Sequence, residues 1–133
     1  MTALNTPRNG TLKAGSTVSG IGYLLAQDGT NTLDLSAVTE VCLGVSADES
    51  ERDASGLVTG GMVSFYPLGG MLMCASGTGI TWALGDTVYV GAGGLATATA
   101  GSNKKLGLYV GEGTTTTADG DLIPVMTAGA DIA

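Results

Sequence analysis

The stretch GDTVYVGAGGLATAT, residues 85–99, decides the fold class of this chain. Gly-Asp is a turn dipeptide, and the Thr-Val-Tyr-Val run at 87–90 contains only the β-branched and aromatic residues that strands favour. The glycine-rich residues 91–94 are a second turn signal, and residues 95–99 follow as another short strand-like run. This order of signals predicts a β-hairpin that turns at residues 91–94.

The same pattern extends outward in both directions. The chain has 133 residues, of which 23 are glycines scattered between short runs rich in Val, Leu, Tyr and Thr. No stretch has the apolar period of a helix, and strand-like runs recur about every 8 to 12 residues, which is typical of a sandwich or a small barrel. We therefore expect an all-β fold, a small antiparallel barrel or sandwich (a tulip-like open barrel included). Residues 16–133 would form a single domain, and residues 1–15 an extended N-terminal arm.

The remaining elements follow from the positions of turn residues. We expect Gly69-Gly70 to join two strands of a hairpin, with Pro67 at a strand end or on an edge, and Gly20 and Gly22 to mark a bend or a close backbone approach. In the strand at 41–46, Val41, Leu43 and Val45 should share one face.

The expected strands are 16–26, 41–46, 62–68, 71–76, 80–82, 87–90, 95–99, 106–110 and 122–126. The polar segment 47–61 is an expected loop, and residues 111–121 are a connection.

Charge and apolar content limit the partners and the compartment. The formal net charge of −7 disfavours binding to nucleic-acid phosphates and to anionic membranes. No apolar run is long enough to span a membrane, and residues 1–15 lack the apolar core of a secretory signal. We therefore expect folding in a cytoplasm, with Cys42 and Cys74 reduced and packed as small hydrophobes. A disulfide between the two remains the alternative.

The residues that carry most enzyme chemistry are missing or isolated. The chain has no histidine, so neither a serine nor a cysteine nucleophile has its common base, and two cysteines alone lack the ligands for zinc. Residues 91–96 match the letters of the dinucleotide fingerprint G-x-G-x-x-A, but a hairpin turn fits this stretch better than a helix N-terminus. The acids beside turns are expected to serve those turns rather than catalysis or calcium binding; they are Asp28, Asp34, Asp86, Asp119 and Asp121. We expect no enzyme activity, no cofactor and no metal.

Two kinds of residue could serve either a core or an interface. Trp82, the one tryptophan, is either a core anchor or an interface anchor. Met62, Met71 and Met73 belong either to the core or to an adaptable contact patch.

The order of several short motifs resembles a known family. After glycines around Val18 come, in chain order, Leu43-Gly44-Val45, Pro67-Leu68-Gly69-Gly70, Ile80, Gly85-Asp86-Thr87-Val88-Tyr89-Val90, Gly93-Gly94-Leu95, Leu106-Gly107-Leu108 and Asp119-Gly120-Asp121-Leu122-Ile123-Pro124-Val125. With these motifs the chain resembles, over about residues 10–127, the glycine-rich head decoration (capsid cement) proteins of tailed bacteriophages.

The resemblance implies a structural protein of the virion, made in the host cytoplasm, that binds and stabilises the outer surface of the icosahedral head. Its partner would be the major capsid protein, and it would be a homotrimer without enzymatic residues. The resemblance also implies that the N-terminal arm reaches onto the capsid, and Thr6, Pro7 and Arg8 are the expected contacts. The alternatives are another β module of a virion (a tail, fibre or baseplate component) and a small hydrolase or carbohydrate-binding module.

Overall fold

The computed structural model describes residues 10–14, 18, 20–28, 32–47, 52–53, 56–57, 62–112 and 114–130. Within these ranges the chain consists of strands and turns with one short 3-10 helix and no α-helix, which confirms the expected all-β class. The elements are β1 (Gly10–Ala14), β2 (Leu24–Asp28), β3 (Thr32–Leu35), β4 (Gly44–Ser46), β5 (Arg52–Asp53), β6 (Gly56–Leu57), β7 (Met62–Pro67), β8 (Met71–Ala75), β9 (Thr81–Ala83), β10 (Thr87–Val90), η1 (Ala92–Gly94), β11 (Ala96–Thr97), β12 (Lys105–Tyr109), β13 (Thr114–Thr116) and β14 (Leu122–Met126).

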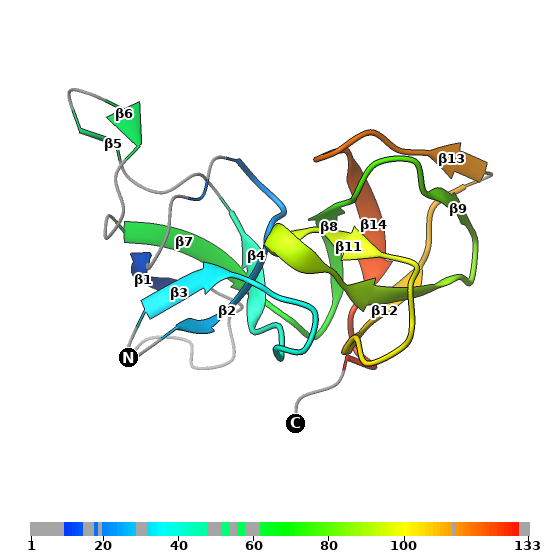
Figure 1. The fold of residues 1–133 in the computed structure, drawn as a ribbon, viewed down its shortest axis with the longest axis horizontal. Helices are drawn as coiled ribbons and strands as arrows, with labels where there is room; N and C mark the ends of the chain where they lie inside the picture. Colours follow the sequence, from blue (N-terminus) through cyan, green and yellow to red (C-terminus); the bar gives the residue numbers. More distant parts are fainter. Residues whose placement is uncertain are drawn as a thin grey trace, which may run out of the picture.

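The first half of the chain forms a closed barrel with the strand order β1-β3-β2-β4-β7 (Figure 1). β2 and β3 pair as antiparallel neighbours, and β4 joins β2 to β7. β1 closes the barrel by pairing antiparallel with β7 and parallel with β3. This one parallel pair is the exception to the antiparallel barrel that we expected. A closed ring of five strands cannot alternate in direction throughout, so four antiparallel pairs leave the fifth pair parallel.

The second half forms a five-stranded antiparallel sheet in the order β11-β10-β12-β14-β8. The predicted hairpin at residues 87–97 is confirmed, because β10 pairs antiparallel with β11 and η1 makes the turn between them. β9 and β13 form a separate two-stranded sheet at the far end from the barrel (Figure 1). β13 lies inside the expected connection 111–121, so the threonine run is a strand that the sequence did not predict.

The expected hairpin at Gly69-Gly70 is wrong, because this glycine pair joins the two halves of the fold. β7 pairs with β1 and β4 in the barrel, whereas β8 pairs with β14 in the sheet. Buried Thr127 holds the crossover: its Oγ1 accepts from the Gly69 amide at 2.9 Å and donates to the Gly70 carbonyl at 2.7 Å. Pro67 is the last residue of β7, as expected.

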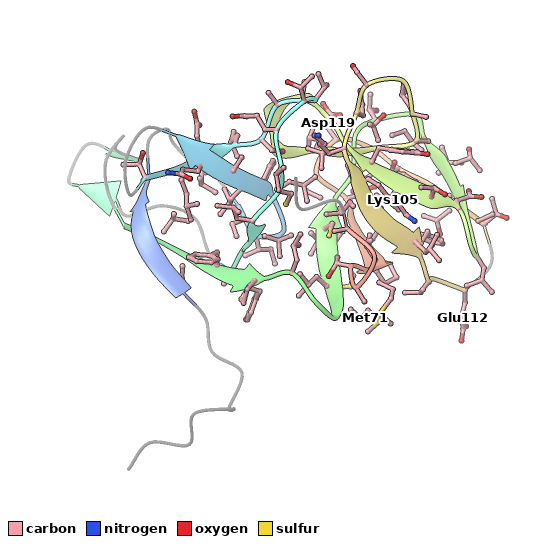
Figure 2. The ribbon with its side chains drawn as sticks, turned by 90° about the horizontal axis from the view of Figure 1, so that it is seen from below. Met71, Lys105, Glu112 and Asp119 are labelled. Atoms are coloured by element: carbon pink, nitrogen blue, oxygen red, sulfur yellow. The ribbon has the colours of Figure 1, made fainter. Side chains whose placement is uncertain are left out.

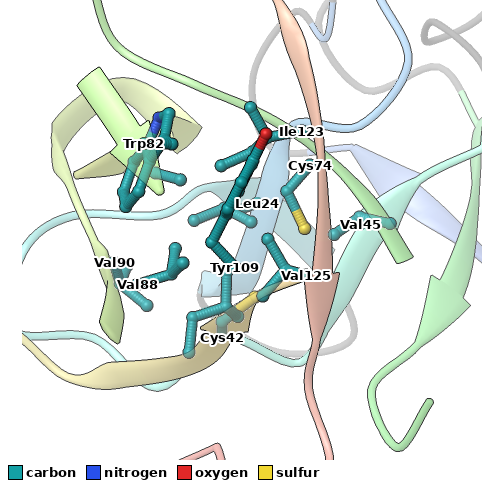
Figure 3. Close-up of a cluster of buried hydrophobic side chains, with 12 residues drawn as sticks. Leu24, Cys42, Val45, Cys74, Trp82, Val88, Val90, Tyr109, Ile123 and Val125 are labelled. Carbon is teal, nitrogen blue, oxygen red and sulfur yellow. The ribbon is translucent and has the colours of Figure 1, made fainter. Parts of the chain in front are cut away.

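The two halves share a core. Val18, Leu25, Leu33 and Val63 form a cluster of barrel side chains. A larger cluster contains Trp82, Tyr109 and the inward residues of the sheet, and also includes Leu24, Cys42 and Val45 from the barrel half (Figure 3). Neighbouring residues of β2 therefore point to different clusters, Leu24 to the shared one and Leu25 to the barrel one, as the period of two requires.

Gly22 marks a close backbone approach between the halves, as predicted for this segment. Its φ is +81°, and an added Cβ would lie 2.5 Å from Leu122 Cδ2 and 3.0 Å from the Met73 carbonyl oxygen. The carbonyl of Gly22 accepts from the Ala75 amide at 2.7 Å, so a side chain here would separate the barrel from β8.

Other expectations need correction at their boundaries. The strand expected at 16–26 begins only at Leu24, and the one expected at 41–46 only at Gly44. As a result, Val41, Leu43 and Val45 do not share a face: Leu43 is 44% exposed, whereas Val45 is 1% exposed. The period of two holds only inside a regular strand, and residues 41–43 precede it.

Two expected segments are only partly described. In the polar segment 47–61, β5 and β6 pair as a short ladder, and most of the remainder lies outside the described residues. In the expected arm, Gly10–Ala14 form β1 and belong to the barrel, while residues 1–9 lie outside the described residues. The arm, with Thr6, Pro7 and Arg8, therefore stays a prediction.

Candidate binding surface

The acids beside turns hold those turns closed. Asp86 Oδ2 accepts from the Ala83 amide at 2.8 Å, and Asp121 Oδ2 accepts from the Ala118 amide at 2.8 Å. Both turns have the sequence Ala-x-Gly-Asp. Asp34 differs, because it lies inside β3 and its Oδ1 accepts from the amide of the next residue, Leu35, at 2.7 Å. For Asp86 and Asp121 the turn interpretation is confirmed. Asp119 is an exposed residue of the second turn, and the side chain of Asp28 lies outside the described residues.

The described residues bring no metal-binding group together. No cluster of three or more cysteine or carboxylate side chains is found in the parts of the chain that the structure covers. None of the helices described there is long and apolar enough to cross a membrane. The fingerprint-like residues 91–96 lie in the β10–β11 hairpin, where η1 is a single short turn with Gly93 at φ +66°.

The two cysteines are free and buried in the shared core (Figure 3). Cys42 is 2% exposed and Cys74 is 0% exposed, so both pack as small hydrophobes, as predicted. Burial raises the pKa of the Cys42 thiol from about 9 to about 11. Burial, together with the neighbouring Cys42, also raises the pKa of Cys74. Neither thiol is therefore a thiolate nucleophile near neutral pH.

Trp82 is a core residue, so the expected interface anchor is corrected. Its side chain is 0% exposed, and its ring stacks on Tyr109 with 6.0 Å between ring centroids. The indole Nε1 donates to Oγ of Ser76 at 2.9 Å, which satisfies its polar atom inside the core. A ring held in this way has no surface left for a partner.

The methionines supply the surface that the tryptophan does not. Met71 is 61% exposed and Met73 is 46% exposed, which favours the contact patch over the core for these two; the side chain of Met62 is not among those described. Both methionines lie on β8, a strand at the end of the five-stranded sheet. Figure 2 shows Met71 at the lower edge of the coloured ribbon and Asp119 at its upper edge.

Strand register places further apolar side chains beside them. Met71 lies opposite Met126, which in turn lies opposite Leu108, so a row of three exposed apolar residues crosses three strands. Met73 lies opposite Pro124 in the next outward row, and exposed Leu122 follows on β14. We call this outer side of β8, β14 and β12 the methionine face; its residues are Met71, Met73, Leu108, Leu122, Pro124 and Met126.

A groove continues the methionine face toward the barrel. Its volume is ≈ 460 Å³, and Met71, Met73 and Leu122 line it from the sheet side. Ile21, 50% exposed, and Tyr66, 43% exposed, line it from the other side. Among the residues that the structure describes, none that lines the groove or belongs to the methionine face is charged. The described residues therefore form one extended apolar surface of a size that marks contact sites on proteins.

Two residues of this surface, Met71 and Met73, could be predicted as contact candidates from the sequence, whereas the others could not. A signal was present, because residues 122–126 are Leu-Ile-Pro-Val-Met, apolar on both faces of the strand although one face is solvated. An antiparallel strand that is apolar on both faces departs from the usual alternation and indicates a covered outer face.

The comparisons with known proteins match this fold class in a phage structure. No protein-family model and no curated protein sequence matches the chain. Among solved structures, the crystal structure of the head fiber gp8.5 N base of bacteriophage phi29 has a similar fold, with a TM-score of 0.54 and 19% sequence identity. The similarity covers 96% of this chain and 99% of that chain, so the barrel and the sheet are both included.

Proposed function

We propose that this chain is a bacteriophage structural protein that binds the outer surface of the head, as a homotrimer, and stabilises the shell. The observation that carries the proposal is the fold likeness to a phage head fiber base over nearly the whole of both chains. The order of the sequence motifs, which resembles that of head decoration proteins, supports the same assignment independently of the fold.

The surface chemistry is consistent with a binding role. The described residues offer an uncharged apolar face and groove, and the carboxylates of Asp86 and Asp121 are occupied in turn hydrogen bonds. A protein that binds assembled heads and not free subunits stabilises the head by mass action, and several copies in one complex add avidity. We propose the major capsid protein as the partner of this chain. We propose no catalysis, no cofactor and no metal.

A second candidate function follows from what the structural neighbour is. That neighbour is the base of a head fiber, so this chain would be the head-bound base of a longer projection rather than a decoration that ends at its own surface. The two candidates share the site on the head and differ in what continues outward from it.

Binding to heads is the direct test. Purified protein is mixed with heads that lack it, and pelleting followed by gel analysis measures how much protein co-sediments. The decoration role predicts saturable binding and a higher temperature of head disruption. Absence of binding to heads would refute the proposal. Binding without any gain in thermal resistance would favour the fiber-base alternative.

Variants of the predicted arm test where contact is made. Replacing Thr6, Pro7 and Arg8 together by alanine should weaken binding to heads without changing the melting temperature of the free protein. Asp119→Ala is the control, because Asp119 is an exposed turn residue that does not belong to the predicted arm. Equal binding by the triple variant and the control would show that these three residues are not contacts. Electron microscopy of complete particles distinguishes the two candidate functions. Density that ends at this chain supports the decoration role, and density that continues outward from it supports the fiber base.

A further inference from the structure

We infer that copies of this chain associate through the methionine face, which in the proposed homotrimer converges on the three-fold axis with the same face of the other two copies. The inference deepens the proposed function, which expects several copies in one complex, by assigning the surface that joins them.

Exposed apolar side chains gather on this surface instead of scattering. Among the residues that the structure describes, nine large hydrophobic side chains are exposed. Seven of them lie on the methionine face or across its groove; they are Ile21, Tyr66, Met71, Met73, Leu108, Leu122 and Met126. Scattered exposed hydrophobics are ordinary on a protein surface, whereas a continuous patch marks a contact.

The area agrees with an interface between copies. With exposed fractions between 37% and 61%, these seven side chains present roughly 600 Å² of surface, at the upper end of the largest patch on a typical monomer. A stable protein interface buries about 800 Å² on each partner, and its rim is polar. The face and the far side of its groove therefore supply most of such an interface, and a polar rim of about 200 Å² would complete it.

Charge separates this surface from the rest of the chain. With a formal net charge of −7, two copies repel one another over most approaches. The described residues of the methionine face and its groove include no charged side chain, so association through them brings none of their charges into contact. Depletion of charge with enrichment of methionine and tyrosine is the composition of interface centres.

The surface that covers the methionine face is the methionine face of another copy. The other two exposed large hydrophobics in the described ranges, Leu43 and Leu84, stand alone, so no second apolar patch is described that could cover the first. The face is also exposed from the moment the chain folds. A surface that waited for a head would meanwhile be an aggregation liability, whereas another copy is present from synthesis onward. Like faces meet only around a symmetry axis, so Met71 and Met126 should lie near that axis.

The mass of the protein in solution, measured without heads, is the first test. The wild type should sediment as a multiple of 13.1 kDa. Met71→Glu or Met126→Glu should give the single-chain mass and raise the dissociation constant by about two orders of magnitude or more, because an unpaired charge would be buried. Leu84→Glu is the matched control, since Leu84 is 71% exposed and lies outside the face; it should keep the wild-type mass.

Cross-linking at the axis is the second test. Met71→Cys adds one accessible thiol, because Cys42 and Cys74 are both buried. A short bis-maleimide should then join copies covalently at Met71→Cys and should not do so at Leu84→Cys.

The outcomes separate this inference from head binding. A monomeric wild type, an unchanged mass for both glutamate variants, or equal cross-linking at the two cysteine positions would overturn it. If Met71→Glu lost head binding while keeping its mass, the face would contact the head; the inference would then be wrong and the proposed function would stand. If the wild type is a multimer, the glutamate variants dissociate and the wild type does not bind heads, the proposed function is refuted and this inference stays in place.

Discussion

The indole Nε1 of Trp82 donates a 2.9 Å hydrogen bond to Oγ of Ser76 inside the core. The same Oγ lies 3.0 Å from Oγ1 of Thr117, which donates to the Gly77 carbonyl oxygen at 2.7 Å. All three side chains are at most 4% exposed. The chain of bonds ties β9 and the segment after β13 to the end of β8, and it allows a tryptophan to be buried without an unpaired polar atom.

Ser76→Ala should lower the free energy of unfolding by about 1–3 kcal/mol, because it leaves the Trp82 donor without its partner in the core. Urea unfolding followed by tryptophan fluorescence measures the change, since Trp82 is the one tryptophan. A loss below about 0.5 kcal/mol would show that the network is not a stabilising unit.

Ser36→Ala is the opposite case. Ser36 is 1% exposed, and its Oγ is a buried hydroxyl with no hydrogen-bond partner in the described part of the chain. Removing it deletes an uncompensated polar group, so stability should stay constant or rise by up to about 1 kcal/mol. The same urea titration, run beside Ser76→Ala, checks this. A clear loss of stability would mean that the hydroxyl is in fact bonded.

Gly107→Ala should destabilise the sheet strongly. An added Cβ would collide with the Met126 carbonyl oxygen and would lie 2.8 Å from the Met126 carbonyl carbon, where β12 and β14 run side by side. Backbone atoms of a paired strand move little, so we expect a loss of about 2–3 kcal/mol in thermal or urea unfolding. Gly70→Ala is the control, because nothing lies within 4 Å of its added Cβ. The two variants should therefore differ clearly, and equal stabilities would contradict the close strand packing.

The Ala-x-Gly-Asp turns give a test of the turn interpretation of the acids. Asp86→Ala and Asp121→Ala each remove an acceptor for an amide at 2.8 Å, and each should cost about 0.5–1.5 kcal/mol. Asp119→Ala, an exposed residue at another position of the second turn, should change stability by less than about 0.5 kcal/mol. If the three variants behaved alike in thermal unfolding, the carboxylate hydrogen bonds would not stabilise the turns.

The buried thiols predict a loss of stability in alkali. The pKa of Cys42 is raised from about 9 to about 11 by burial, so between these values the unfolded thiol ionises while the folded one keeps its proton. The free energy of unfolding should thus be insensitive to this group below about pH 9. Above it, stability should fall by about 1.4 kcal/mol per pH unit until the folded pKa is reached.

Cys42→Ser is the comparison for this prediction. Serine cannot ionise in this range, and its hydroxyl can replace the thiol that donates to the Gly44 carbonyl oxygen at 3.2 Å. Urea unfolding at several pH values between 8 and 11 should show a shallower decline for the variant than for the wild type. Parallel declines would show that Cys42 does not contribute to the pH dependence.

Much of the local structure could be predicted because the signals for turns and strands depend on residues that are adjacent in the sequence. Gly85-Asp86 and Asp119-Gly120 form turns where their dipeptides indicate, and residues 87–90 form a strand. Trp82 and the exposed Met71 could not be assigned in the same way. A large apolar residue has the same local signature in a core and on an interface, and only the packing of the rest of the chain decides between them.

The sequence by itself determined the all-β class, the hairpin at β10–β11 and the hydrogen bonding of Asp86 and Asp121 within their turns. The reason is that glycine conformation and strand propensity act over a few residues. Only the tertiary structure decided that Gly69-Gly70 crosses from a closed barrel to a second sheet, and that Met71, Met126 and Leu108 form one row. Strand pairing joins residues that are distant in the chain, and its register follows from which side chains fill the shared core, which no local pattern of residues specifies.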